Sequence, residues 1–537
     1  MANTKIPNEL LELGVKTFGT SSIMIGDTTT GTIDAADNNV GLGVDVFAAL
    51  TSGDYNTAVG TGALTANTTG NYNVAVGGVA LDANTTGASN TAIGTSSLGA
   101  NTTGGNNTAL GTDCLSGNTT ASNNTAVGKY ALRVNTTGTE NVAVGSLSLD
   151  ANTTASYNTA VGFGSLSGTI TGNQNAAFGY LALAANTALK NTAVGAYAHY
   201  QSTSAQESTA VGYAALAALT TGSNNTAVGA LALDANTTAN YNTAVGYDSL
   251  STNITGQYNT ALGAYALKNT TGGGHTAVGE EALLTNSSSS YNTAVGWRAL
   301  KLNTTASTNT AVGSFASQNN TTGAQNTTVG SSAGAAITTA ANNTCIGYAA
   351  GDDLTTGGQN VIIGSLNNAG NVGRAGLVAL GYSLSGGINN ALLFGYGSTD
   401  SQIAFGANSI TTPSDIRLKE DIQDEEVGLD FINDLRPVTF RWKKEKDIPS
   451  DMKAYKEGSE ERTMNGKYNH GFIAQEVKAT IDSYDLKDGF DMWQEDDTDG
   501  RQRVAPAAIM SVMVKAVQEL STQVDELKQE LIALKGE

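Results

Sequence analysis

The sequence predicts a mainly β protein: a parallel β-solenoid or β-roll of about 22 coils with a 17-residue period, followed by a small α+β domain ending in a coiled-coil helix. Three observations predict this. A pentapeptide close to Asn-Thr-Ala-Val-Gly recurs along the chain, as at 56–60 and 124–128. Its glycine marks 22 positions from Gly26 to Gly381, with only two steps of 16 residues. Charged residues then rise from 28 in residues 1–413 to 46 in residues 414–537, so two differently built parts meet there.

Each period is expected to form one coil. Such a constant repeat means that each unit stacks on the last, with neighbours completing a core that no single unit could bury. Seventeen residues allow two short strands and two corners but not a strand with a crossover helix. With strands about 4.8 Å apart, the stack would form a rod on the order of 100 Å long.

Positions within the period predict the elements of the coil. Side chains alternate along a strand, so the second and fourth pentapeptide residues are expected to face the core. The third, alanine in 17 of 20 periods from Gly60 to Gly381, would face another surface. Leucine follows the glycine by four residues in 14 of the 15 periods from Gly60 to Gly296, which predicts a second short strand. His199 replaces that leucine once, and a tolerated interruption is favoured over a ligand contact.

The remaining residues of the period form a polar corner. Asn-Thr-Thr-Gly, as at 67–70, suits a sharp turn because Asn and Gly tolerate left-handed backbone. Stacked Asn and Thr at equivalent corners are expected to form hydrogen-bonded ladders, so the many Asn-x-Thr triplets are not evidence of glycosylation.

The pentapeptides at 73–77 and 141–145, Asn-Val-Ala-Val-Gly, resemble the left-handed β-roll head repeats of trimeric autotransporter adhesins. The period there is somewhat shorter than 17, which leaves the handedness of this solenoid open. The resemblance implies a homotrimer with small residues packed between chains, and the outward alanines agree with it.

The last 124 residues have ordinary α+β patterns. Helical spacing covers 426–435, a β-like run covers 438–442, and 471–477 follows. Apolar residues then alternate by four and three, as in the a and d positions of a coiled coil over about 510–535. They are Met513, Val517, Leu520, Val524, Leu527, Leu531 and Leu534. A single amphipathic helix packed on its own domain is the alternative.

This region resembles the endosialidase-type self-cleaving intramolecular chaperone of phage tail fibres and tailspikes. The resemblance rests on residues 414–422, 435–440 and 470–477 and the terminal coiled coil. It implies a domain that trimerises, guides folding of the preceding β region and is then removed by self-cleavage. It assigns Ser414 as the nucleophile and Lys419 as its base.

That chemistry suits the residues, because a serine hydroxyl needs a base and a buried lysine with a lowered pKa can serve. The expected scissile bond is Pro413–Ser414, and Ser414–Asp415 stays open. Asp415, Arg417 and His470 are candidate supporting residues. Otherwise Asp415 and Arg417 would form a surface ion pair, and His470 would lie in a turn.

Composition excludes several classes. A net charge of −20 without clustered Lys and Arg argues against nucleic-acid binding. Gly, Asn and Thr interrupt every apolar run, so no membrane insertion is expected, and the N-terminus does not look like a secretory signal. Cys114 and Cys345 lie in no metal or redox motif and are expected to be small buried residues. No cofactor and no metal site are expected.

Aromatic residues recur beside the coil glycine, as at Phe163 and Trp297, and before the pentapeptide, as at Tyr55. They either cover coil edges, which is favoured, or stack on sugar rings. The less regular coils after Gly313 are a candidate cap or receptor-binding tip.

The repeat predicts the rod, and the resemblance of the C-terminal region implies a phage tail fibre located in the virion and assembled in the host cytoplasm. Residues 1–20 would attach to other virion proteins, 21–395 would form the adhesin shaft, 396–413 a linker and 414–537 the chaperone. The expected partners are two further copies, phage tail proteins and a host receptor of polysaccharide type. At most it would be a single-turnover serine peptidase acting on itself. The alternatives are a bacterial trimeric surface adhesin and a tailspike that depolymerises host polysaccharide.

Overall fold

The computed structural model divides into two compact units, Met1–Pro413 and Ser414–Glu537. The residues that it describes are 15–18, 21–26, 35–168, 171–407, 410–411, 414, 416, 419–452, 454–464, 466–486, 492–495 and 501–536.

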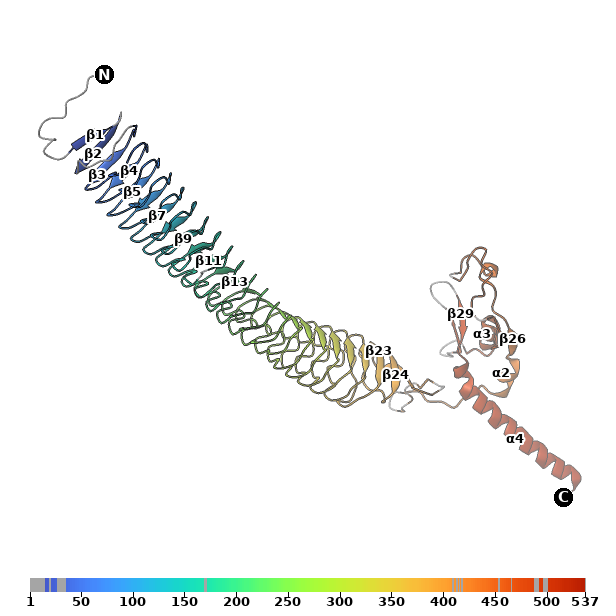
Figure 1. Ribbon diagram of the computed structural model, residues 1–537. Coiled ribbons are helices and arrows are strands. Elements are labelled where there is room, and N and C mark those ends of the chain that lie inside the picture. Colours follow the sequence, from blue (N-terminus) through green and yellow to red (C-terminus); the bar gives the residue numbers. More distant parts are fainter. Residues whose placement is uncertain are drawn as a thin grey trace. The chain divides into compact units, whose positions relative to one another are not determined.

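The first unit is a parallel β-solenoid of about 21 turns with the 17-residue period (Figure 1). Each turn contributes one short strand, which pairs in register with the strands of the turns before and after it, as Ala58 pairs with Ala75. The parallel ladder runs from β2 (Ser22–Gly26) and β3 (Val40–Gly43) to β23 (Leu377–Tyr382) and β24 (Ala391–Tyr396). The three-residue strands between them are β4 (Thr57–Val59), β5 (Val74–Val76), β6 (Thr91–Ile93), β7 (Thr108–Leu110), β8 (Thr125–Val127), β9 (Val142–Val144), β10 (Thr159–Val161), β11 (Ala176–Phe178), β12 (Thr192–Val194), β13 (Thr209–Val211), β14 (Thr226–Val228), β15 (Thr243–Val245), β16 (Thr260–Leu262), β17 (Thr276–Val278), β18 (Thr293–Val295), β19 (Thr310–Val312), β20 (Thr327–Val329), β21 (Thr344–Ile346) and β22 (Val361–Ile363).

Antiparallel strands pair with both ends of this ladder. β1 (Val15–Phe18) pairs with β2, and β25 (Thr399–Ala404) pairs with β24. Each covers a strand edge that would otherwise offer unpaired backbone groups to another chain. β25 lies inside the segment predicted as a linker, and β1 inside the predicted N-terminal segment.

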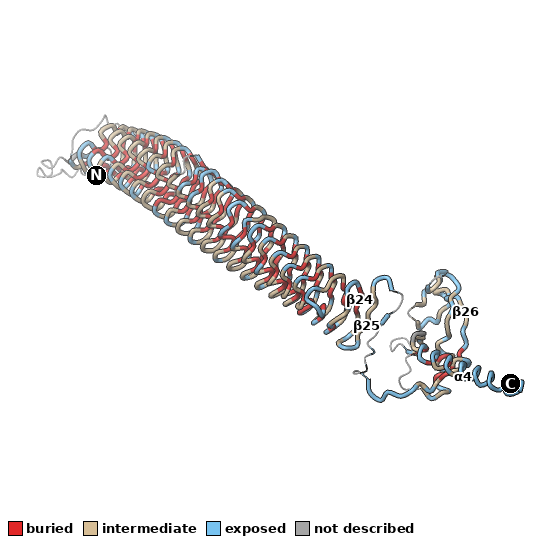
Figure 2. The backbone as a smooth tube through the Cα atoms, turned by 90° about the horizontal axis from the view of Figure 1, so that it is seen from below, coloured by how far each residue is buried: buried red, intermediate tan, exposed pale blue. Residues whose placement is uncertain are grey.

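The assignment of the two strand faces from sequence was wrong. Where the central residue of the strand is alanine it is fully buried, whereas the flanking residues are partly or largely exposed, as at Thr57, Ala58 and Val59. The buried alanines stack with the repeated leucines in a core cluster that runs from Met24 to Ala316, and a second cluster follows from Ala333 to Leu393. Figure 2 shows the buried residues recurring in coil after coil. Because a coil with one three-residue strand encloses little space, alanine fits inside and branched residues stay outside.

The predicted second strand was also wrong, although its leucine is buried. Leu64 has a φ of +54° and lies in a turn. Its N–H still donates to the carbonyl of Ala80 in the next coil, at 3.1 Å. Left-handed residues are costly away from glycine, but here they close the coil while keeping the bond to its neighbour.

The predicted Asn and Thr ladders are confirmed. The Nδ2 of Asn84 donates to the Oδ1 of Asn67 at 2.9 Å and to the carbonyl of Gly87 at 3.0 Å. The Oγ1 of Thr68 donates to the carbonyl of Thr85 at 2.9 Å. These bonds satisfy buried amides that would otherwise destabilise the coil.

Both cysteines are free and buried, as expected. Burial raises the pKa of the Cys114 and Cys345 thiols to about 12, so neither is a ready thiolate.

His199 is fully buried, and neither of its ring nitrogens has a hydrogen-bond partner. Burial lowers the pKa of His199 from 6.5 to about 3. Between those values the unfolded chain binds a proton that the folded chain rejects. This group therefore makes stability fall by about 1.4 kcal/mol for each pH unit of acidification.

Replacing His199 by leucine, the residue of the other coils, is expected to stabilise the solenoid, and more so in acid. Thermal denaturation of both proteins at about pH 7 and about pH 4.5 measures this, because every other titrating group is common to the two. An equal difference in midpoint at the two pH values would contradict a histidine buried in its neutral form.

The second unit is a small α+β domain with a terminal helix. Its core contains Phe431, Val477, Ile481 and Val512, from three helices packed together. Its elements are α2 (Leu429–Asp434), β26 (Val438–Phe440), the 3₁₀ turn η2 (Glu445–Asp447), β27 (Asn469–Gly471), α3 (Ala474–Ser483), β28 (Trp493–Glu495), β29 (Gln502–Val504), the 3₁₀ turn η3 (Pro506–Ile509) and α4 (Met510–Lys535).

Candidate functional site

The structure brings together the two residues predicted as a catalytic dyad. The Nζ of Lys419 donates a hydrogen bond to the Oγ of Ser414 at 2.8 Å. The five-residue spacing therefore lets the amine reach the hydroxyl, which is the contact that proton transfer requires. Both residues are exposed in the single chain.

The other predicted residues do not join this pair in the described part of the chain. Pro413, Asp415 and Arg417 lie outside the described residues. His470 lies on β27, and its Nδ1 is 3.2 Å from the Oγ1 of Thr439 on β26. No hydrogen bond between His470 and Ser414 or Lys419 occurs among the described residues.

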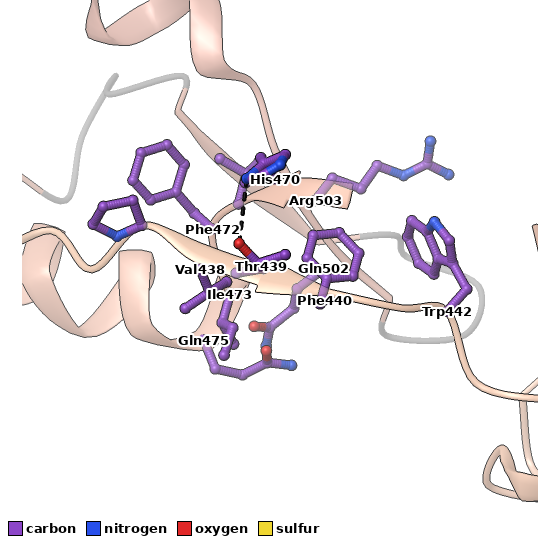
Figure 3. Close-up of a pocket in the computed structure, with 14 residues that line it drawn as sticks. Val438, Thr439, Phe440, Trp442, His470, Phe472, Ile473, Gln475, Gln502 and Arg503 are labelled. Atoms are coloured by element: carbon purple, nitrogen blue, oxygen red, sulfur yellow. Dashed lines mark hydrogen bonds between the residues drawn. The ribbon is translucent and has the colours of Figure 1, made fainter. Parts of the chain in front are cut away.

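His470 instead lines a cavity of about 920 Å³ beside the β26–β27 pair (Figure 3). Phe440, Phe472 and Ile473 supply much of its apolar wall, and Gln502 and Arg503 reach it from β29.

An ion pair that was not predicted from the sequence links Arg436 to Glu476 on α3. The Arg436 guanidinium donates to both carboxylate oxygens of Glu476, with Nε at 2.9 Å from Oε2. These hydrogen bonds lower the pKa of Glu476. Both residues belong to the segments that carried the family resemblance, but a single sequence does not show that positions 40 apart are paired.

The terminal helix has two faces. Val512 and Ala516 are buried against the domain, and the backbone N–H of Leu429 donates to the Oε2 of Glu519 at 2.7 Å. The heptad residues form a second, exposed face. Val517, for example, is 64% exposed and Leu527 is 63% exposed. We call this face the heptad stripe; it consists of Met513, Val517, Leu520, Val524, Leu527, Leu531 and Leu534.

No helix among the described residues combines the length and the apolar character needed to cross a membrane. The described residues also contain no cluster of three or more His, Cys, Asp or Glu side chains arranged to hold a metal ion.

Comparison with known proteins identifies the second unit. Neither the curated proteins nor the solved structures contain a match to this chain. A family model described as "Chaperone of endosialidase" matches residues 414–486, from the dyad serine to the end of α3 and the turn after it. The chain therefore contains a parallel β-solenoid followed in sequence by a chaperone of endosialidase domain. This combination fits a phage tail fibre or tailspike-like protein.

Proposed function

We propose that this protein is a receptor-binding phage tail fibre whose C-terminal domain assembles three chains, assists folding of the solenoid and then cuts itself off beside Ser414. The observation that carries the proposal is the chaperone domain at 414–486, which directly follows about 21 solenoid turns.

The topology of the solenoid supports the need for a chaperone. A coil makes most of its backbone hydrogen bonds to residues about 17 positions away, as Thr57 does to Asn73 at 2.8 Å. During folding, the backbone groups at the edge of the last coil stay unpaired until the next coil forms. Parallel pairing of this kind is slow and exposes edges to aggregation. A domain that gathers the chains would set their register and raise their local concentration.

The heptad stripe supports self-association. Seven apolar residues exposed at a and d positions along one helix are typical of a coiled-coil seam. In a homotrimer, each helix would cover the stripes of the other two.

Replacing both Val524 and Leu527 by glutamate is expected to convert the homotrimer to monomers, because the seam would then bury like charges. Size-exclusion chromatography with light scattering measures the mass directly. Gln529→Glu, on the opposite side of the helix, adds charge without touching the stripe and should leave the mass unchanged. A wild-type protein that elutes as a monomer would contradict the proposed trimer.

The parts of the chain receive these roles in the proposal. Residues 1–20 join the virion, residues 21–395 form the shaft that reaches the host, and residues 396–413 connect the shaft to the chaperone. The fibre assembles in the host cytoplasm and ends in the virion, where its shaft binds a host polysaccharide.

Binding to cells tests the receptor role. Fluorescently labelled full-length protein is expected to bind some strains of a bacterial panel and not others, and to slow adsorption of a phage that infects a bound strain. Uniform absence of binding across the panel would contradict a receptor-binding fibre.

A further inference from the structure

Aromatic rings concentrate at one corner of the solenoid. In the twelve coils that begin at Gly128 through Gly313, the first or second residue after the glycine is aromatic in nine. We call this set the aromatic corner. Its members are Tyr130, Phe163, Tyr180, Tyr197, Tyr213, Tyr247, Tyr265, Trp297 and Phe315.

The repeat shows that the coil does not require these rings. The four coils beginning at Gly60, Gly77, Gly94 and Gly111 have no ring at either position, and the coil of Gly330 has Ser331 and Ser332 there. The backbone is the same in both cases: Ser96 N–H donates to the Gly78 carbonyl at 3.0 Å, as Tyr197 N–H donates to that of Tyr180 at 2.9 Å. The rings are therefore an addition to the repeat and not a requirement of it.

Ring geometry leaves some aromatic faces open at this corner, although Phe163 and Tyr180 stack in parallel at 14° and Arg298 covers one face of Trp297. Tyr213 meets Tyr197 edge to face, with 87° between the planes, and Tyr247 meets Tyr265 at 88°. In such pairs one ring presents its edge, so at most one face is covered. Tyr213 is 57% exposed. By contrast, Tyr55 and Tyr72, at a different position in the coil, stack in parallel at 6° and cover each other's faces.

Cationic side chains gather at the same corner of an acidic chain. Residues 41–413 contain seven Lys and Arg, and five of them follow a coil glycine in this span by at most five residues. The Arg298 guanidinium lies 4.6 Å from the Trp297 ring centroid, and the Lys268 Nζ lies 5.2 Å from that of Tyr265. Lys268 also pairs with Asp248 at 2.6 Å, and Glu281 pairs with Arg298 at 2.6 Å. The rings thus alternate with paired donors and acceptors that water can reach.

We propose that the aromatic corner is a binding site for an extended polysaccharide that lies along the solenoid; this rests on the proposed receptor-binding function. The C–H face of a sugar ring is apolar and carries partial positive charge, which suits the negative face of an aromatic ring. The hydroxyl groups of the sugar can form hydrogen bonds with the charged side chains that lie between the aromatic rings. A repeating polymer also matches a site that repeats with each coil, about every 4.8 Å.

The charges favour a glycan over a second copy of the chain. The core of a protein interface is enriched in aromatic residues and Arg but depleted of Lys, Glu and Asp, and this corner includes Lys268, Asp248 and Glu281 among its rings. The heptad stripe of α4 has no charged member and suits the contact between copies.

The site is tested with full-length protein on an array of purified bacterial capsular and O-chain polysaccharides, both neutral and anionic. The variant carries Tyr213→Ser, Tyr247→Ser and Trp297→Ser, since Ser314 and Ser331 already occupy this coil position. The matched control carries Tyr55→Ser, Tyr72→Ser and Tyr291→Ser, because Ser89 occupies their position. The corner variant is expected to bind at least about tenfold more weakly than wild type, with the control unchanged.

The other outcomes distinguish a failure of the aromatic-corner proposal from a failure of the proposed receptor function. Equal binding by variant and wild type would overturn the aromatic corner and leave the receptor role standing. A wild type that binds bacteria but no glycan on the array would also overturn it. A corner variant that loses its oligomeric mass would show that the rings contact another copy instead. Failure to bind both cells and glycans would overturn the receptor role itself.

Discussion

Replacing Gly229 by alanine is expected to keep the coils around it from closing. Gly229 has a φ of +134°, a conformation essentially restricted to glycine. A Cβ there would also lie 2.5 Å from the carbonyl oxygen of Gly246 and 2.7 Å from its carbon. Both obstacles are backbone atoms of the next coil, so no side chain can move aside. The expected loss is on the order of 3 kcal/mol or more.

Gly78→Ala is the matched control. Gly78 follows a coil glycine directly, lacks a left-handed backbone, and has no atom within 4 Å of an added Cβ. Hydrogen exchange read by mass spectrometry should show fast exchange in the coils flanking residue 229 and wild-type protection in the control. A Gly229→Ala protein with unchanged protection would mean that the coils are not stacked as tightly as the structure has them.

The same contact explains why the register of the solenoid could be predicted from sequence. At the coil glycines from Gly43 to Gly347, an added Cβ would lie 2.4–2.7 Å from the carbonyl oxygen of the next one. Only glycine fits at this position of the coil, so a glycine in the sequence marks every turn. No residue type identifies the two strand faces in this way, because the alternation of Thr57, Ala58 and Val59 does not show which face points into the coil. That depends on how small the coil is, and a single strand per coil makes the inside the alanine side.

The second strand was mispredicted for a related reason. Leucine at a fixed position indicates burial, which is correct for Leu64, but it does not indicate φ. Leucine disfavours a φ of +54° in isolation. Bonds to the neighbouring coils, such as Leu64 N–H to the Ala80 carbonyl, hold it there.

In the second unit, the sequence was informative where partners are close along the chain. Ser414 and Lys419 are five residues apart and are in hydrogen-bond contact. Arg436 and Glu476 meet only because the segment between them folds, so their pairing needed the structure. His470 had a candidate role beside Ser414, and the structure instead places it with Thr439 at the cavity of the β26–β27 pair.

Replacing Ser414 by alanine or Lys419 by methionine is expected to leave the chain uncut. In the proposed reaction the Ser414 Oγ attacks the carbonyl carbon of the scissile peptide, and its proton passes to the neutral Lys419 amine. Lys419 then gives this proton to the peptide nitrogen, which leaves as an amine, and water hydrolyses the ester and restores the serine. Removing either partner of such a unit lowers the rate by a factor on the order of 10⁴ or more.

Denaturing electrophoresis and mass spectrometry of purified protein check this. Wild type should lose about 124 residues, the length of the second unit, and the N-terminus of the released fragment identifies the scissile bond. Ser450→Ala and Lys443→Met, both exposed residues of the same unit, should cut normally. Normal cutting by Ser414→Ala would exclude the dyad, and an intact wild-type chain would leave a chaperone that does not cleave.

Because Ser414 and Lys419 are exposed in the single chain, cleavage is expected to depend on assembly. Because a neutral lysine is favoured by burial, Ser414 and Lys419 should react only after other copies cover them. The Val524→Glu, Leu527→Glu protein, expected to be monomeric, should therefore stay uncut with its dyad intact, whereas Gln529→Glu should cut like wild type. Cutting after assembly would also make folding effectively irreversible, since the finished solenoid could no longer refold with its helper. A monomeric variant that cuts at the wild-type rate would show that the single chain alone activates the serine, and the proposed order of assembly before cleavage would be wrong.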